Sequence, residues 1–178
     1  MISIFLIDLN ITLKHSIMTI SKKVEDAFNA QITAELWSSN IYLEMAFWFR
    51  KEGWEGFAKW MYKQAEEERE HAFDMADFVL NRGGEAKVSA IDAVPMEFKD
   101  PQDVFEQTYA HEQKVTELIN KLSEVAEEEN DRASINFIAK YIDEQVEEEK
   151  NVRAILHRFY HQKGHAIGLI DQQLGARE

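Results

Sequence analysis

Two side chains that commonly bind metals stand three residues apart in the first half of the chain, where Glu68 is followed by His71. On an α-helix this spacing places both on one face, so a carboxylate oxygen and an imidazole nitrogen can reach the same ion. Alone, the pair is a weak signal, because most acids and histidines at this spacing face solvent. The pair indicates a metal site only if other ligands lie beside it.

Carboxylates interrupt the inward-facing series of every long helical segment. Steps of three and four residues along each segment follow a mainly apolar face, as expected for helices that pack together. One acid stands in the middle of each series: Glu35, Glu68, Glu112 and Glu148. We therefore expect four carboxylates to meet in one buried layer.

Such a layer needs compensating positive charge, because burying an ionised carboxylate costs on the order of several kcal/mol. The inward series contain no lysine or arginine, which leaves protonation or bound metal. Two divalent ions would balance four carboxylates, and hard oxygen ligands with one imidazole suit iron.

Other acids, aromatic residues and histidines have simpler interpretations. Acid runs such as 127–129 ordinarily form solvated helix faces, and we expect this of Glu66, Glu128 and Glu149. The tryptophans and tyrosines fit core or contact positions. We expect the remaining histidines to lie outside the acidic layer: His111, His157, His161 and His165.

Composition narrows the function further. A length of 178 residues with 45% apolar residues suits one domain, and a net charge of −13 disfavours nucleic-acid or anionic-membrane partners. The absence of cysteine excludes disulfides, thiolate metal sites and a cysteine nucleophile. Any metal must therefore bind to oxygen and nitrogen ligands.

The apolar spacing predicts an all-α fold with four long helices and a short fifth. Ser21 is a good N-cap and Gly53 a good C-cap for the first helix, while Asp100 followed by Pro101 should open the third. The expected ranges are about 21–51, 54–81, 101–129, 131–162 and 166–174.

The connections predict how these helices are arranged. Short turns make the first two helices antiparallel, and likewise the last two, whereas the segment between residues 84 and 100 is unusually long for a loop. A segment of that length can run along the bundle and join two parallel helices. The result is an up-down-down-up four-helix bundle with one long crossover loop.

The first residues do not share this pattern. Residues 1–17 lack the basic start and cleavage site of a secretory signal, and Asp8 interrupts their apolar run. We treat 1–17 as a leader or extension outside the fold, with Met18 as the hypothetical start of a domain over 18–178.

Three stretches on separate helices together resemble the bacterial non-haem ferritins. They are AELWSS at 34–39, EEREH at 67–71 and YIDEQVEEEK at 141–150, and the resemblance extends over about 20–174. It implies iron storage by a ferritin-like bundle: Fe(II) is oxidised by dioxygen or hydrogen peroxide at a di-iron centre, and a ferric oxide-hydroxide mineral is deposited inside a shell. It also implies a cytoplasmic homo-oligomer of twenty-four subunits, in which the fifth helix lines the fourfold axes.

The resemblance assigns roles residue by residue. It implies that Glu35, Glu68 and His71 bind one iron, with Glu68 bridging to a second iron. Glu112 and Glu148 would hold that second iron, with Gln145 beside it and Tyr42 as a hydrogen-bond donor and candidate electron donor. A third iron position is implied at Glu67, Glu144, Glu147 and Glu148.

Some positions depart from related patterns. Bacterioferritins repeat the Glu-x-x-His pair on the fourth helix, where this chain has Gln145 and Glu148, so no haem is expected. Lys140 replaces a tryptophan that many ferritins carry, and Ile135 and Ile138 stand where animal threefold channels have carboxylates. The usual uptake route for iron is therefore not predicted.

Two alternatives to storage remain open at this level. A di-iron oxidase or peroxidase of the rubrerythrin type would use the same ligands without storing mineral, although no rubredoxin cysteines are present. A structural helical bundle would need the mid-helix acids to face water, as a misphasing of each helix by one position would produce.

Overall fold

The structure is a computed structural model that describes residues 19–94, 97–162 and 167–176. These residues form an all-α fold, and the helices are α1 (Lys22–Glu52), α2 (Glu55–Asn81), α3 (Pro101–Glu128), α4 (Arg132–Gln162) and α5 (Ile167–Gly175). No helix within these ranges is both long and apolar enough to cross a membrane. The predictions for residues 1–17, Gly164, His165 and Ala166 lie outside the described residues.

Capping residues define the helix ends where the sequence predicted them. The side chain of Ser21 accepts a backbone N–H from the first turn of α1, and Gly53 ends that helix with a left-handed φ of 83°. Asp100 caps α3 in the same way as Ser21 caps α1, with Pro101 at the first helical position. These local signals fix where the bundle helices begin and end.

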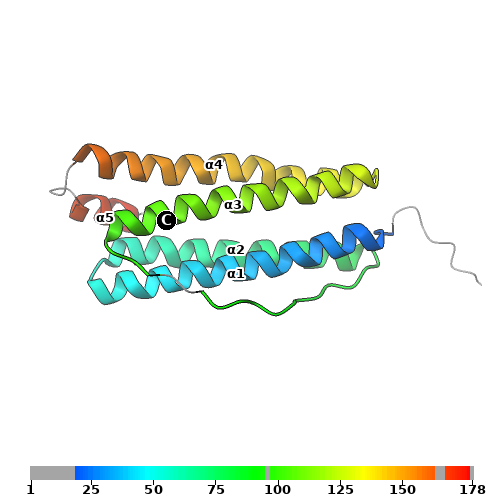
Figure 1. Cartoon of the computed structure of the whole chain (residues 1–178), viewed down its shortest axis with the longest axis horizontal. Coiled ribbons are helices and arrows are strands. Elements are labelled where there is room, and N and C mark those ends of the chain that lie inside the picture. The colour runs from blue at the N-terminus through cyan, green and yellow to red at the C-terminus, as the bar shows by residue number, and fades with distance from the viewer. Residues whose placement is uncertain (1–18, 95–96, 163–166, 177–178) are drawn as a thin grey trace, which may run out of the picture.

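The helices form two antiparallel pairs, α1 with α2 and α3 with α4, joined by a crossover that follows the bundle beside α1 (Figure 1). The side chain of Asn29 accepts from the backbone N–H of Lys87 at 2.7 Å, and Thr33 accepts from that of Ser89 at 3.1 Å. Four helical residues and two extended residues both advance about 6 Å, which keeps this pairing in step. The predicted up-down-down-up bundle is confirmed.

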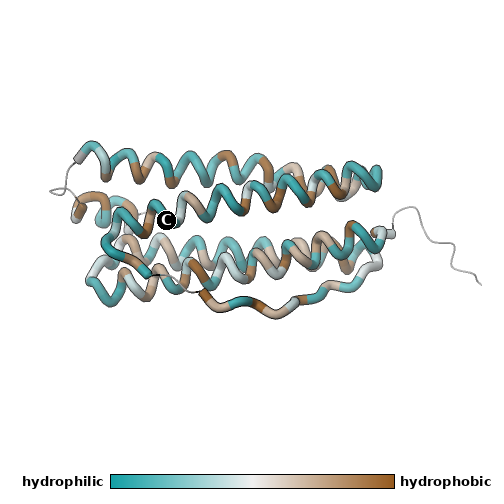
Figure 2. Tube along the Cα trace, in the orientation of Figure 1, coloured by the Kyte–Doolittle hydropathy of each residue, from teal (hydrophilic) through white to brown (hydrophobic). Residues whose placement is uncertain are grey.

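Two apolar clusters fill the bundle on either side of a polar middle. One includes Phe49, Phe57 and Phe105, and the other includes Phe28 and Ile119. Along each long helix the mid-helix acid falls between the two clusters. Figure 2 shows the underlying pattern, in which apolar and polar residues alternate along every helix.

The short helix α5 packs closely on the start of α2. The backbone N–H of Phe57 donates to Asp171 Oδ1 at 2.8 Å. A Cβ atom on Gly56 would lie only 1.8 Å from the carbonyl oxygen of Asp171, so this contact requires glycine. The predicted fifth helix is thus a docked part of the fold.

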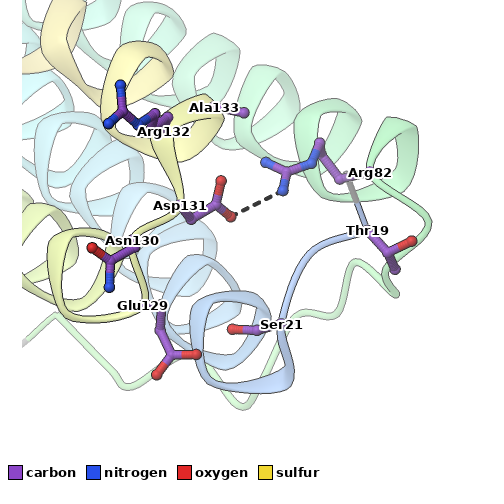
Figure 3. Close-up of a pocket in the computed structure, with 8 residues that line it drawn as sticks. All are labelled: Thr19, Ser21, Arg82, Glu129, Asn130, Asp131, Arg132 and Ala133. Carbon is purple, nitrogen blue, oxygen red and sulfur yellow. Dashed lines mark hydrogen bonds and ion pairs between the residues drawn. The ribbon is translucent and has the colours of Figure 1, made fainter. Parts of the chain in front are cut away.

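At the opposite end, an ion pair ties α2 to the turn between α3 and α4. Arg82 Nη2 lies 3.0 Å from Asp131 Oδ2, and both side chains are largely buried (Figure 3). Asn130, with φ of 53°, follows the end of α3. A surface hollow of about 540 Å³ adjoins this pair. Because Asp131 is neutralised by Arg82, the hollow is a poor candidate for a cation site.

Candidate metal centre

Three potential metal ligands meet between α1 and α2. Ligand atoms of Glu35, Glu68 and His71 all lie within 4.8 Å of one another. The two glutamates are only 1% and 5% exposed, and His71 Nδ1 lies 3.7 Å from Glu68 Oε2. The three residues therefore form a compact group of two buried oxygen ligands and one partly exposed nitrogen ligand.

Two buried oxygens of this group lack a hydrogen-bond partner. Gln31 Nε2 donates to Glu35 Oε1 at 2.8 Å, but within the described residues Glu35 Oε2 and Glu68 Oε2 have no donor. A buried, unpaired carboxylate oxygen is costly unless a proton or cation meets it. The donor set and the free oxygens thus fit a metal ion.

A second group of polar side chains surrounds Glu112 on α3. The hydroxyl of Tyr42 donates to Glu112 Oε1, and Gln145 Nε2 donates to Glu112 Oε2 at 3.2 Å. Glu112 is fully buried, whereas Glu148 is half-buried and accepts from Gln64 Nε2 at 3.2 Å. Helices α1, α2, α3 and α4 therefore all contribute to the polar layer.

Burial dominates the protonation of these carboxyl groups. Desolvation raises the pKa of Glu35 well above its usual value, and the charge of Glu68 raises it further. Desolvation also raises the pKa of Glu68 to about 8, and that of Glu112 in the same direction. Without a metal, the layer lowers its charge by holding protons.

His71 is held by a carboxylate from α4. Its Nε2 lies 3.2 Å from Glu144 Oε1. Burial alone would lower the pKa of His71, but the hydrogen bond and charge of Glu144 outweigh it and raise that pKa. The same hydrogen bond lowers the pKa of Glu144. Glu144 therefore orients the imidazole from the opposite helix pair.

The structure brings some of the predicted site residues into contact and leaves others apart. Glu35, Glu68 and His71 meet directly, and Glu144 reaches His71. Tyr42 and Gln145 meet at Glu112. Among the described residues, the compact group does not extend to Glu112, Glu148, Glu67 or Glu147. Glu67 is half-buried and Glu147 exposed.

A hydrogen-bond chain from Gln145 was not expected from the sequence. Gln145 Nε2 donates to Thr116 Oγ1 at 3.3 Å, and Thr116 Oγ1 donates to Glu149 Oε1 at 2.7 Å. The expectation of a solvated Glu149 is therefore wrong, because the residue is half-buried in this chain. Only the inward position of Thr116, one turn after Glu112, could have hinted at its role.

His111 lies beside the layer, where it is buried against aromatic side chains. Its ring lies 5.8 Å from that of Tyr42 and 5.9 Å from that of Trp37, measured between centroids. Desolvation lowers the pKa of His111 to about 4, so the imidazole is neutral at pH 7. It adds no charge to the acidic layer.

The chain is similar in sequence to known proteins. The family model described as Ferritin-like domain matches residues 25–160. A bacterial non-heme ferritin of Bacteroides fragilis (strain 638R) is 46% identical over 158 residues, which cover 89% of this chain and 99% of that protein. A probable bacterial non-heme ferritin-like protein of Haemophilus influenzae is 38% identical, with 88% and 96% covered.

A solved ferritin structure has a similar fold. The open pore ferritin from the archaeon Archaeoglobus fulgidus superimposes with a TM-score of 0.86 at 40% identity. The superposition covers 90% of this chain and 99% of that one. The likeness therefore includes the four long helices and their crossover.

Proposed function

Because this chain belongs to the ferritin-like family, we propose that it stores iron, and that it oxidises Fe(II) at the mid-bundle carboxylate layer before the ferric product is deposited as mineral. The proposal rests on the compact group of Glu35, Glu68 and His71, in which two buried oxygens have no donor among the residues that the structure describes. An Fe(II) ion supplies the charge that these oxygens need.

The two irons occupy neighbouring positions in the layer. Glu35, Glu68 and His71 bind the first, and Glu68 bridges toward a second held by Glu112 and Glu148. The hydrogen bonds from Tyr42 and Gln145 to Glu112 support this arrangement, because they fix the carboxylate that must bind. Tyr42, which contacts Glu112, is also a candidate donor of an additional electron.

The substrate ions and the protons of the site exchange places. Glu35 and Glu68 hold protons more tightly than ordinary carboxyls do, so binding of Fe(II) releases these protons. Two ferrous ions supply two electrons, which reduce one dioxygen to hydrogen peroxide or one hydrogen peroxide to water. Hydrolysis of the resulting Fe(III) to oxide-hydroxide releases further protons.

Acids beyond the pair of irons lead toward the storage space. Glu67, Glu144, Glu147 and Glu148 form the proposed third iron position, and the contact of Glu144 with His71 links it to the first. Storage further requires a closed shell, which we propose to be a cytoplasmic homo-oligomer of twenty-four copies without haem. Gel filtration with light scattering and iron analysis tests this size, and a dimer would favour a non-storing oxidase.

The site itself is tested by the variant Glu68→Gln, which keeps the side-chain shape but removes the charge and one metal-ligating oxygen. We expect the initial rate of Fe(II) oxidation, followed by stopped-flow absorbance, to fall at least about tenfold. The control is Glu66→Gln, because Glu66 lies on the same helix but is exposed to solvent.

Both variants should remain helical by circular dichroism. The control should oxidise Fe(II) at the rate of the unmodified protein. Equal initial rates for Glu68→Gln and the unmodified protein would refute the mid-bundle site.

A further inference from the structure

Two exposed histidines stand one turn apart near the end of α4. The Nε2 atoms of His157 and His161 are 2.9 Å apart, and their ring centroids are 4.1 Å apart. Both side chains lie on the outside of the chain. They form a pair of imidazole nitrogens that already face each other.

This pair is separate from the carboxylate layer. His157 follows Glu148 by nine residues, or about 13 Å along the helix axis and two and a half turns. Half a turn beyond two full turns places His157 on the side of α4 opposite Glu148. The pair is therefore an independent feature of the surface.

Neighbouring side chains anchor the part of α4 that carries the pair. Phe159, between the two histidines, is buried in the bundle and fixes this part of α4. Arg158 Nη1 donates to Gln173 Oε1 at 3.2 Å, and the hydroxyl of Tyr160 donates to Glu106 Oε1 at 3.1 Å. Arg158 and Tyr160 therefore connect this part of α4 to α5 and α3.

The 2.9 Å between the nitrogens is the length of a hydrogen bond, and it also matches two adjacent ligands of one metal ion. Metal–imidazole bonds of about 2.05 Å that meet at a right angle place two nitrogens about 2.9 Å apart, whereas tetrahedral ligands lie about 3.3 Å apart. Right-angle coordination by nitrogen is typical of Cu²⁺ and Ni²⁺, and Cu²⁺ binds most strongly among the divalent first-row ions. Fe²⁺ stands near the weak end of that order.

We propose that His157 and His161 form a second metal site, on the outer face of α4, which chelates a divalent transition ion with a preference for Cu²⁺. In the metal-free state one Nε2–H donates to the other Nε2. When the ion binds, both protons reside on Nδ1 and both Nε2 lone pairs coordinate the metal, while water completes the coordination. No electron transfer is involved, and the site does not depend on iron storage.

The test is a titration of the assembled, iron-free protein with Cu²⁺ at neutral pH, followed by calorimetry and electron paramagnetic resonance. We expect a Cu²⁺ signal with two nitrogen ligands in the unmodified protein. His157→Gln and His161→Gln should each lose it and bind Cu²⁺ at least about tenfold more weakly, because one imidazole no longer chelates. His71→Gln is the matched control and should keep the two-nitrogen signal.

Two results would overturn the site. One is a two-nitrogen signal that survives in both His157→Gln and His161→Gln, and the other is a signal that disappears in His71→Gln alone. Fe(II) oxidation provides a separate measurement, since both surface variants should oxidise Fe(II) at the rate of the unmodified protein. A failure of the copper site would therefore leave the proposed iron site untouched, and the reverse also holds.

Discussion

Burying a single carboxylate in the polar layer costs free energy, and a bound proton or cation reduces that cost. Glu35 and Glu68 are almost completely buried, and two of their oxygens lack hydrogen-bond donors in the described residues. In the metal-free protein, protons reduce this cost by neutralising the carboxyls. A metal ion also neutralises the carboxylates, and it displaces their protons when it binds. Metal binding therefore depends on pH.

The stability of the metal-free protein should therefore depend on pH through Glu68. Its pKa is about 8 in the folded chain against an ordinary value of 4.5. Because the folded-state pKa is raised, Glu68 makes its full contribution to the free energy of unfolding below about pH 4.5. This contribution is lost as the pH rises through 8. We expect Glu68→Gln to lose less stability than the unmodified protein between pH 5 and pH 9, measured by thermal unfolding.

The control for this prediction is Glu66→Gln, which should follow the unmodified protein across the whole range. Parallel curves for Glu68→Gln and the unmodified protein would show that this carboxyl does not retain its proton when buried.

A second prediction at this scale concerns Thr116. Its hydroxyl connects Gln145 to Glu149, so Thr116→Val removes the donor to Glu149 and leaves the largely buried Gln145 amide with acceptors on Glu112 alone. We expect a loss of about 1 kcal/mol in the free energy of unfolding, together with slower Fe(II) oxidation. Thr116→Ser keeps the hydroxyl and should restore both properties. If the valine variant matches the unmodified protein in both measurements, the chain does not position Gln145.

At the scale of whole elements, close backbone contacts determine how the accessory parts attach to the bundle. The crossover follows α1 through Asn29 and Thr33, whose side chains satisfy its backbone groups. Helix α5 instead approaches α2 at Gly56, where a side chain would collide with the carbonyl of Asp171. The first contact is polar and exposed, whereas the second depends on the absence of a Cβ atom.

The contact between α2 and α5 predicts opposite results for two glycines. Gly56→Ala forces the helices apart and should lower the free energy of unfolding in urea by about 1–3 kcal/mol. Gly168→Ala on α5 meets nothing within 4 Å. It should be neutral or add about 0.5–1 kcal/mol, because alanine favours the helix. A neutral Gly56→Ala would mean that α5 is not tightly docked.

At the scale of the whole molecule, the net charge bears on iron binding and the exposed apolar residues bear on assembly. The net charge of −13 raises the local concentration of cations and repels polyanions. At the same time Phe47, Phe73 and Leu80 on α1 and α2 are more than half exposed. We propose that neighbouring subunits of the shell cover these side chains.

The proposal that the domain spans 18–178 predicts how a chain without residues 1–17 behaves. We propose that residues 1–17 do not contribute to the fold, since Ser21 caps the first helix and the family match starts at residue 25. A chain that begins at Met18 should keep its particle size in gel filtration. Its free energy of unfolding should stay within about 0.5 kcal/mol of the full chain. A smaller particle would show that this segment takes part in assembly.

The helices and their order could be predicted because their signals are local. Ser21, Gly53 and Asp100 mark helix ends through hydrogen bonds or backbone angles within a few residues. The inward position of Glu35, Glu68 and the other mid-helix acids follows from a period of 3.6 residues, which also needs no knowledge of the neighbouring helices. Their roles as metal ligands stay predictions.

What the sequence determined by itself was therefore a set of amphipathic helices with one polar layer across their middle. Only the tertiary structure decided which atoms in that layer meet: Thr116 with Glu149, Glu144 with His71, and buried His111 beside Tyr42. Each of these contacts joins two different helices. They depend on the rotation and offset of each helix against its neighbours, and a change of one residue turns a side chain by about 100°.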